Sequence, residues 1–394
     1  MKRFFYLTVL HVFNDGFEGS LLLLLPFISH ELHINLAQVG MIGTSEGMME
    51  ILFSLPAIYF AARLGSIRVL LMALGIYTVG FLLTSISPNL FLLFITFIIA
   101  GVGFGLFHSI AFGLVSEWSD RSTRGKQLAN FTASGDIGKI ALTTVLTIII
   151  GFIGWRFTAF FYGIVALFCL LLFIKLLSSS EKFHTTTKSQ TISVPLHDFF
   201  TNISFVTANF VNIFDTLAST SLYIFLPFLL MKRGINPSTL GAFTAMFFLG
   251  NFLGKTLLGR LVDKYSNTKI FIISEISMAI FIFILANALS PIIIFGAAIA
   301  LGIFTKGTVP VVKSMISESV EHHQNFDKAF GINTIIASTA AALAPLILGF
   351  LSNSYGIVLA FNFCAVSALL AIIPATIYKI VHGKLPKPQL ATAE

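Results

Sequence analysis

Twelve long apolar segments constrain this chain more than any other feature of its sequence. Each is close to or above the roughly 20 residues that an α-helix needs to cross a hydrocarbon core about 30 Å thick. The apolar runs are unbroken rather than alternating, which excludes the strands of a membrane barrel. We therefore predict an all-α membrane protein with twelve transmembrane helices, at residues 4–28, 37–61, 68–86, 89–116, 127–151, 157–177, 201–230, 238–262, 269–289, 292–318, 329–352 and 357–380.

The composition supports this prediction and excludes other classes of protein. With 56% hydrophobic and 10% charged residues, a water-soluble domain would expose large apolar patches. The basic pI of about 9.4 reflects loop Lys and Arg residues, which set topology in membrane proteins, so no nucleic-acid partner is expected. Cys169 and Cys364 both fall within apolar segments, so neither a disulfide framework nor a metal site is predicted.

The sequence offers no pairing of a nucleophile with a base, so we predict no enzyme and no cofactor. The glycine-rich run at residues 101–105 (GVGFG) resembles part of a dinucleotide loop, but it lies inside an apolar segment with no preceding strand. Close helix packing explains it better. A receptor or scaffold that transports nothing remains an alternative from another class.

A repeat divides the chain into two similar copies. Residues 34–40 (INLAQVG) return as residues 235–241 (INPSTLG), 201 positions later and without gaps, and six apolar segments fall in each copy. A repeat of this length predicts a duplicated structural unit. We expect an N-terminal six-helix bundle at 1–177, a cytoplasmic linker at 178–200, and a C-terminal six-helix bundle with a short cytoplasmic tail at 201–394.

The distribution of Lys and Arg predicts the orientation in the membrane. Of the 24 Lys and Arg residues, four lie within spans and three (Arg156, Lys232 and Arg233) lie on one side, while the other 17 lie at the N-terminus, the even-numbered loops and the C-terminal tail. Positive loops face the cytoplasm. We predict a multi-pass plasma (inner) membrane protein that contacts lipid as a monomer, with both termini in the cytoplasm.

Two six-helix halves in the same orientation form the parallel-repeat arrangement of the major facilitator superfamily, and a loop motif adds a specific resemblance. Residues 259–264 (GRLVDK), followed by Lys269, resemble the superfamily's cytoplasmic loop signature, which is a Gly, three spacer residues, an Asp and then basic residues. In the first copy, Ile58 replaces the Gly and Ala62 replaces the Asp. The resemblance implies a twelve-helix transporter that works by alternating access.

The same resemblance implies a cytoplasmic gate in which the loop charges latch the helix ends. The alternative is that these side chains are solvated loop charges that follow the positive-inside bias. In either case they would govern conformational switching rather than the choice of solute. The gate residues that the resemblance implies are Arg63, Arg68, Glu117, Asp263, Lys264 and Glu318.

Charges inside the spans are where we expect the transport chemistry. Each costs about 2.5–3.5 kcal/mol at a helix centre on insertion scales, so together they must face a wet cavity or one another. Eleven candidates lie at this depth: Asp15, Glu18, Glu46, Glu50, Asp136, Lys139, Asp215, Lys255, Glu275, Lys306 and Lys313.

The acids of the first copy are the candidates for proton handling. His11, Asp15 and Glu18 are four and three residues apart, so they lie on one helix face. Glu46 and Glu50 are also four apart, and two acids on one face repel unless one is protonated or paired. An imidazole exchanges protons near neutral pH and can relay them. The predicted proton-coupling residues are Asp15, Glu18, Glu46, Glu50 and His11.

The lysines of the second copy predict contact with an anionic part of the solute. Lys306 and Lys313 are seven residues apart and share a helix face. Asp136 and Lys139 are three apart and could neutralise each other as a buried pair that fixes packing, and Lys255 is interpreted as structural. The predicted solute-binding residues are Asn14, Asp136, Lys139, Asp215, Lys306, Lys313 and His108.

A narrower resemblance concerns the direction of transport. Residues 11–15 (HVFND) resemble the opening of the fosmidomycin-resistance branch of the superfamily, whose members are proton-driven exporters, whereas Gly138-Lys139 departs from the Gly-Pro of the usual antiporter signature. We predict a proton-coupled secondary transporter of a small polar or anionic organic solute, with efflux favoured. The alternatives are a proton-coupled importer of a nutrient or siderophore-like chelate, and an uncoupled facilitator.

Overall fold

The computed structural model describes residues 2–119, 124–177, 196–261, 265–320 and 326–382, and within them it contains helices and no strand. This confirms the predicted all-α class. The helices are α1 (Lys2–Leu23), α2 (Leu25–Leu32), α3 (Leu36–Leu64), α4 (Ser66–Ser85), α5 (Leu90–Trp118), α6 (Arg124–Leu177), α7 (Leu196–Thr201), α8 (Ile203–Ser219), α9 (Leu222–Lys232), the short 3-10 helix η1 (Pro237–Thr239), α10 (Leu240–Leu261), α11 (Asn267–Asn287), α12 (Pro291–Ser319), α13 (Phe326–Tyr355) and α14 (Ile357–His382).

Eleven segments of the described chain are long and apolar enough to cross a membrane, and one of them holds two crossings. Asn130–Leu176 has 47 residues, far more than one crossing needs. Its path reverses at Gly154, where φ is 72°, a backbone conformation that glycine adopts without steric cost. The Tyr162 hydroxyl then donates to the Leu142 carbonyl at 2.5 Å, which is out of reach along one straight helix. The twelve predicted spans are thus all present.

The first crossing of each half is a broken helix. α1 and α2 meet at Leu24, and Pro26 lies in the first turn of α2, where its missing N–H has no intrahelical partner to lose. α8 and α9 meet near Thr220 and Ser221. Helices broken at membrane depth leave backbone groups free to face a cavity.

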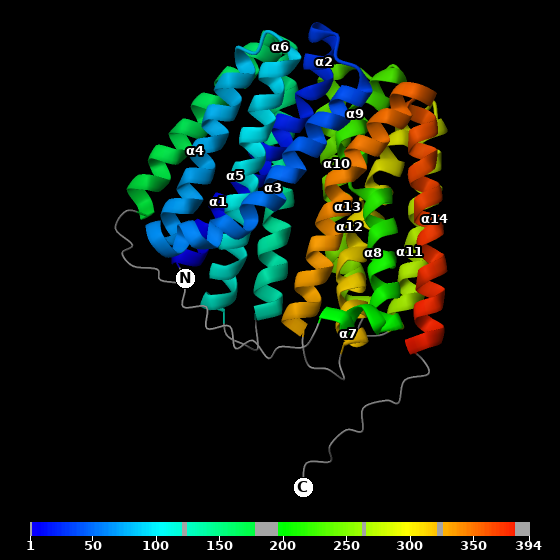
Figure 1. Ribbon diagram of the computed structural model, residues 1–394. Helices are drawn as coiled ribbons and strands as arrows, with labels where there is room; N and C mark the ends of the chain where they lie inside the picture. The colour runs from blue at the N-terminus through cyan, green and yellow to red at the C-terminus, as the bar shows by residue number, and fades with distance from the viewer. Residues whose placement is uncertain (1, 120–123, 178–195, 262–264, 321–325, 383–394) are drawn as a thin grey trace.

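Each half is a bundle with its own packing. In the first half α1 packs on α6, and α5 packs on α3 and α4; in the second half α8 packs on α14, and α12 packs on α10 and α11. The halves meet through α3 against α13 and α6 against α10. Figure 1 shows the two bundles side by side, with the start of α1 and the end of α14 at the same end of the molecule.

The halves are in contact at the end opposite the start of α1. Gly40 in α3 and Gly349 in α13 are so close that a Cβ added to Gly349 would lie 2.8 Å from the Gly40 Cα. Only residues without side chains permit such an approach of two helices. The two halves are therefore packed tightly together at this end.

The same end carries a polar cluster that ties the first half together. The Trp155 indole N–H donates to Glu31 at 2.6 Å and the Arg156 Nε donates to Glu31 at 3.0 Å. Arg156 also donates to the carbonyls of Ser85 and Ser87. These bonds satisfy carbonyls at the end of α4 and fix the reversal in α6 against α2.

The predicted linker lies mostly outside the described residues. Its last positions, from 196 onward, form the short helix α7. The division of the chain at 177 and 201 stays a prediction.

Candidate solute and proton sites

A cavity of about 300 Å³ lies between the two halves. This volume is at the lower end of the range for small-molecule sites. Both halves contribute polar groups, and most of the charge comes from the first. The polar and charged side chains that line it are Glu18, Glu46, Glu50, Lys139, Ser219, Thr220, Tyr223, Asn251, Lys306 and Ser338. Five of the charged residues singled out in the sequence, Glu18, Glu46, Glu50, Lys139 and Lys306, thus share one cavity.

Glu18 and Lys139 form an ion pair on the cavity wall, with 2.8 Å between Lys139 Nζ and Glu18 Oε2. The pair depends on close packing of α1 against α6. Gly138, the residue before Lys139, faces the carbonyl of Val12, and a Cβ there would overlap that group. Gly138 therefore brings Lys139, the residue that departs from the usual antiporter pattern, within reach of Glu18.

Asp136 does not pair with Lys139, which differs from the arrangement suggested by their spacing. Asp136 binds Lys255 of α10 instead, with 2.6 Å between the Lys255 Nζ and an Asp136 oxygen. Although Asp136 and Lys139 are three residues apart, Lys139 is held by α1 and Asp136 by α10. The Asp136–Lys255 bond therefore joins the two halves, and it gives Lys255 a role that the sequence did not predict.

Glu46 and Glu50 project from α3 into the cavity. The backbone of α3 is held at this level by α5, since a Cβ on Gly101 would overlap the Glu46 carbonyl and one on Gly105 would contact the Glu50 carbonyl. This confirms that the glycine run at 101–105 serves helix packing. Neither glutamate has an ion-pair partner within 4 Å among the described residues.

Lys306 lines the opposite wall, on α12. It forms no ion pair with a carboxylate of the described residues. Beside it, the Thr305 hydroxyl lies 3.0 Å from Oδ1 of Asn251, which also lines the cavity. Asn251 occupies the repeat position of Glu50, 201 residues later, so a neutral amide replaces an acid on the second half's wall.

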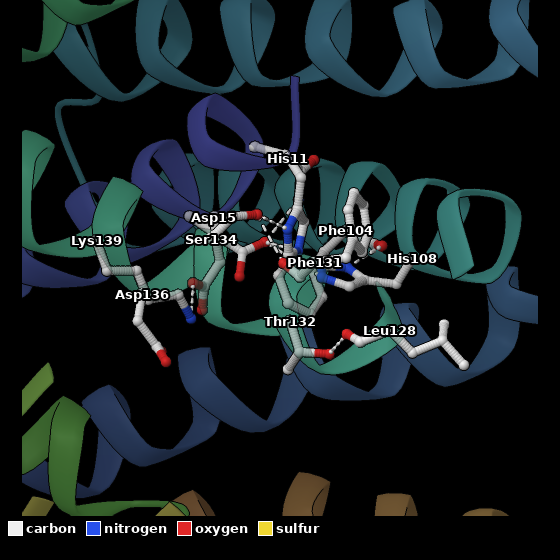
Figure 2. A network of polar contacts seen from close by, with 12 residues as sticks. His11, Asp15, Phe104, His108, Leu128, Phe131, Thr132, Ser134, Asp136 and Lys139 are labelled. Carbon is white, nitrogen blue, oxygen red and sulfur yellow. Dashed lines mark hydrogen bonds and ion pairs between the residues drawn. The ribbon is translucent and has the colours of Figure 1, made fainter. Parts of the chain in front are cut away.

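Behind the first half's wall, two histidines converge on one carboxylate. His11 Nε2 lies 3.3 Å and His108 Nε2 lies 3.2 Å from Oδ1 of Asp15. Figure 2 shows both imidazoles beside the Asp15 carboxyl, with the Phe131 ring next to that of His11. Phe104 stands between this cluster and the cavity, since it lines the cavity and its ring centroid is 4.1 Å from that of His108.

The other nitrogen of each imidazole is already occupied. The Ser134 hydroxyl donates to the Phe131 carbonyl at 2.6 Å, so it accepts from His11 Nδ1, which lies 3.1 Å away. His108 Nδ1 lies 3.3 Å from the Phe104 carbonyl, which can only accept. Both Nδ1 atoms are therefore donors. Each Nε2 atom then bears a hydrogen towards Asp15 only when its imidazole is protonated.

The same three ligand atoms lie within 4.8 Å of one another, close enough to hold a metal ion, which the sequence did not predict. The Asn14 amide also donates to Oδ1 of Asp15, at 3.2 Å. A metal ligated by that oxygen would compete with this donor. The same arrangement could hold exchangeable protons or a metal ion, because each imidazole donates through Nδ1 and presents Nε2 to Asp15.

Charged groups on α3 and α6 act on this cluster, and a glycine of α6 packs closely against it. From α3, Glu50 acts electrostatically on His108. From α6, Lys139 acts on Asp15 and is itself bound to Glu18. Gly135 of α6 faces Asp15 and His11 so closely that a Cβ there would lie 2.9 Å from a carbon of the His11 ring. The cluster and the cavity thus share one electrostatic environment.

Several predicted residues lie outside the cavity. Asn14 is buried against Asp15. Asp215 is buried in the second half, where the Thr308 hydroxyl donates to it at 2.9 Å. Lys313 donates to Asn333 at 2.8 Å, far enough along α12 from Lys306 to leave the cavity lining. None of these three side chains lines the cavity.

Glu275 is a buried acid that the sequence listed by depth but gave no role. It is fully buried, and its carboxyl is hydrogen-bonded to that of Asp215. Asp215 is an ionisable neighbour that acts on it electrostatically. A buried carboxylate pair cannot keep both charges, so at least one of the two retains its proton.

The predicted gate is described only in part. Asp263 and Lys264 lie outside the described residues. Arg63 stacks over the Tyr59 ring at 4.5 Å, and Arg68 and Glu117 are exposed. The gate thus stays a prediction on the first half.

On the second half, Glu318 is tied to neighbouring helices at the end of α12. It accepts from the Asn267 amide at 2.5 Å, at the start of α11. The Tyr378 hydroxyl of α14 lies 3.1 Å from its other oxygen. Glu318 therefore holds α11, α12 and α14 together at the end of the molecule where α14 ends.

Sequence reasoning missed Tyr223, which closes the cavity across the halves. Its hydroxyl donates to the carbonyl of Gly19, joining α9 to α1. No motif marks this tyrosine, because its partner is a backbone group 204 residues away in the sequence.

Comparison with known families identifies the fold. A model of the major facilitator superfamily matches the chain twice, over residues 7–212 and 208–394. The chain belongs to the major facilitator superfamily. The two matches agree with the 201-residue repeat and with the two bundles, and members of this superfamily are transporters of small-molecule solutes rather than enzymes.

Relatives of this superfamily member are transporters as well. A protein of Haemophilus influenzae (strain ATCC 51907 / DSM 11121 / KW20 / Rd) named as a candidate metabolite transport protein is 23% identical over 374 residues, which cover 91% of this chain and 89% of the relative. A bacterial homologue of the human lysosomal transporter Spinster, solved in an inward-facing and occupied conformation, matches 100% of this chain and 98% of its own with a TM-score of 0.74 at 13% identity. A mutant of the nucleoside transporter NupG matches 95% of this chain and 99% of its own with a TM-score of 0.77 at 13% identity.

Proposed function

We propose that this superfamily member is a proton-coupled secondary transporter that moves a small polar or anionic organic solute by alternating access. The observation that carries the proposal is the protonatable cluster of His11, Asp15 and His108 directly behind a charged cavity between the halves. Solute and proton would then bind within one electrostatic environment. The Haemophilus relative, named for metabolite transport, supports a small solute.

The hydrogen-bond arrangement supports proton binding at this cluster. Because both Nδ1 atoms are donors, Oδ1 of Asp15 receives a histidine hydrogen bond only when at least one imidazole carries its second proton. Loss of that proton leaves a nitrogen lone pair facing a carboxylate, which is unfavourable in a buried site. Glu46 and Glu50 would exchange further protons with the cavity, and Glu50 acts on His108 from the cavity side.

Orientation and direction belong to the same proposal. The excess of Lys and Arg in the even-numbered loops supports cytoplasmic termini and a plasma-membrane location. The end of the molecule that carries the start of α1 would then face the cytoplasm. We take the protein to work as a lipid-embedded monomer. The resemblance of residues 11–15 to the fosmidomycin-resistance branch favours efflux, while import of a nutrient or chelate and uncoupled facilitation remain the competing functions.

Proteoliposomes that contain a pH-sensitive dye test the proposal. Organic acids, amino acids, sugars, siderophores and cationic drugs are added in turn, and internal pH is followed with and without the protein. We expect at least one compound to move protons only when the protein is present. A radiolabelled form of that compound should accumulate against its gradient when a pH gradient is imposed. Flux that ignores the pH gradient would indicate a facilitator, and no flux of any compound would indicate a receptor or scaffold.

A further inference from the structure

The charged groups of the cavity do not cancel within each wall. Glu18 is neutralised by Lys139, 2.8 Å away. This leaves Glu46 and Glu50 on α3 and Lys306 on α12, each lining the cavity without an ion-pair partner among the described residues. One wall is therefore acidic and the opposite wall is basic.

The two walls belong to different halves of the molecule. α3 lies in the first bundle and α12 in the second, and the cavity lies between them. Asn251, which also lines the basic wall, is uncharged, and the charged side chains that act on Lys306 from outside the ion-pair distance include both acids and lysines. A charge in a partly dehydrated site is costly without a partner. The bound solute is the component that could supply partners to both walls at once.

We infer that the solute is zwitterionic: an ammonium or other cationic group binds to Glu46 and Glu50, and a carboxylate or other anionic group binds to Lys306. This inference rests on the proposed function and narrows its substrate class. One charge on each half also explains how the solute would draw the halves together. A simple anion would satisfy only Lys306, and a simple cation would satisfy only the α3 wall.

A matched set of small compounds tests the inference by binding alone. The ω-amino acids 4-aminobutanoate, 6-aminohexanoate and 8-aminooctanoate carry both charges at increasing separation. Hexanoate and hexylamine each carry one of the two on the same carbon chain. The readout is the rise in thermal unfolding temperature of the purified full-length protein as each compound is titrated.

We expect the best ω-amino acid to bind at least about tenfold more tightly than hexanoate and hexylamine, since a second charge-assisted contact contributes about that factor or more. Equal binding of hexanoate or of hexylamine would overturn the inference. Protection by none of the three ω-amino acids would overturn it as well.

Variants assign each contact. Lys306→Met should reduce binding of the best ω-amino acid to the level of hexylamine, and Lys306→Arg should restore most of it. Glu50→Gln should reduce binding towards the level of hexanoate. Lys313→Met is the matched control, because Lys313 lies on the same helix but outside the cavity lining. Equal losses in Lys306→Met and Lys313→Met would contradict the assignment.

The binding test separates this inference from the proposed function. Zwitterion preference together with flux that ignores the pH gradient would contradict proton coupling alone. Proton-coupled flux of a simple anion would contradict the zwitterion alone.

Discussion

One helix-packing contact recurs in both halves between residues at equivalent repeat positions. The side chain carried by the contacted residue differs between the halves. In the first half, a Cβ on Gly101 would overlap the carbonyl of Glu46; in the second, a Cβ on Gly302 would overlap the carbonyl of Phe247. Both members of the pair are displaced by the same 201 positions. Glu46 and Phe247 both line the cavity. Duplication therefore kept the backbone approach while the side chains at one position diverged into an acid and an apolar ring.

Buried acids show the same divergence in their surroundings. Asp15 in the first half has two histidines and an asparagine as polar partners beside the cavity. Asp215 in the second half has Thr308 and the neighbouring acid Glu275, away from the cavity. A proton can be exchanged only where a partner and a path to water are present. On this comparison we propose that proton exchange takes place in the first half.

Replacing Asp15 is the most direct test of this difference between the halves. Asp15→Asn removes one partner of a buried charge network, a change that costs about 3–5 kcal/mol. In proteoliposomes that hold equal amounts of folded protein we expect pH-driven transport to fall at least about 100-fold, because a positioned proton-transfer group contributes about 10²–10⁴. Asp215→Asn is the control in the second half and should keep most of the pH-driven flux. Equal losses in the two variants would refute the division of roles.

The glycine contacts sharpen the comparison because they should behave alike in stability. Gly101→Ala and Gly302→Ala each push a Cβ into the facing backbone, and overpacking of this kind costs about 1–3 kcal/mol. We expect similar decreases in thermal unfolding temperature for the two variants. Only Gly101→Ala should also change the response of flux to pH, because it displaces Glu46 rather than Phe247. A pH response altered in both variants would argue against a special role for the acidic wall.

Breaking the Asp136–Lys255 ion pair between the halves is expected to change transport less. Lys255→Met leaves Asp136 without its partner and removes a contact that holds α6 against α10 in the present conformation. Lys255 is partly exposed, so the contribution is modest and we expect turnover to change about three- to tenfold. The exchange Asp136→Lys with Lys255→Asp should recover part of the loss. The test measures flux in the two single variants and in the double variant. If the loss of flux in the double variant equalled the combined losses of the single variants, the two residues would not act as a pair.

The sequence predicted the membrane fold well and the pairing of charges poorly. All twelve spans were located because helices that cross lipid must be continuously apolar. Close packing at 101–105 was recognised because glycines had no other use there. By contrast, the spacing of Asp136 and Lys139 suggested a pair, and the structure gives each a partner on another helix, 119 and 121 residues away. The contact between His108 and Asp15 was likewise not predicted, because the two residues lie on different helices. Spacing fixes a helix face, but the partner helix depends on how the bundles pack.

The smallest effect is predicted for Glu275, and it tests the comparison from the second half's side. Glu275→Gln replaces one of two buried acids that cannot both be ionised, so the substitution removes no charge that the fold requires. We expect transport to stay within about twofold and thermal stability to be unchanged or slightly higher, because an amide needs no proton to remain neutral in a buried site. Glu46→Gln is the same chemical change on the acidic wall of the cavity, and it should instead weaken the dependence of flux on pH. If Glu275→Gln weakened that dependence as much as Glu46→Gln, protons would have to pass through the second half, because a carboxyl away from the cavity would then take part in coupling.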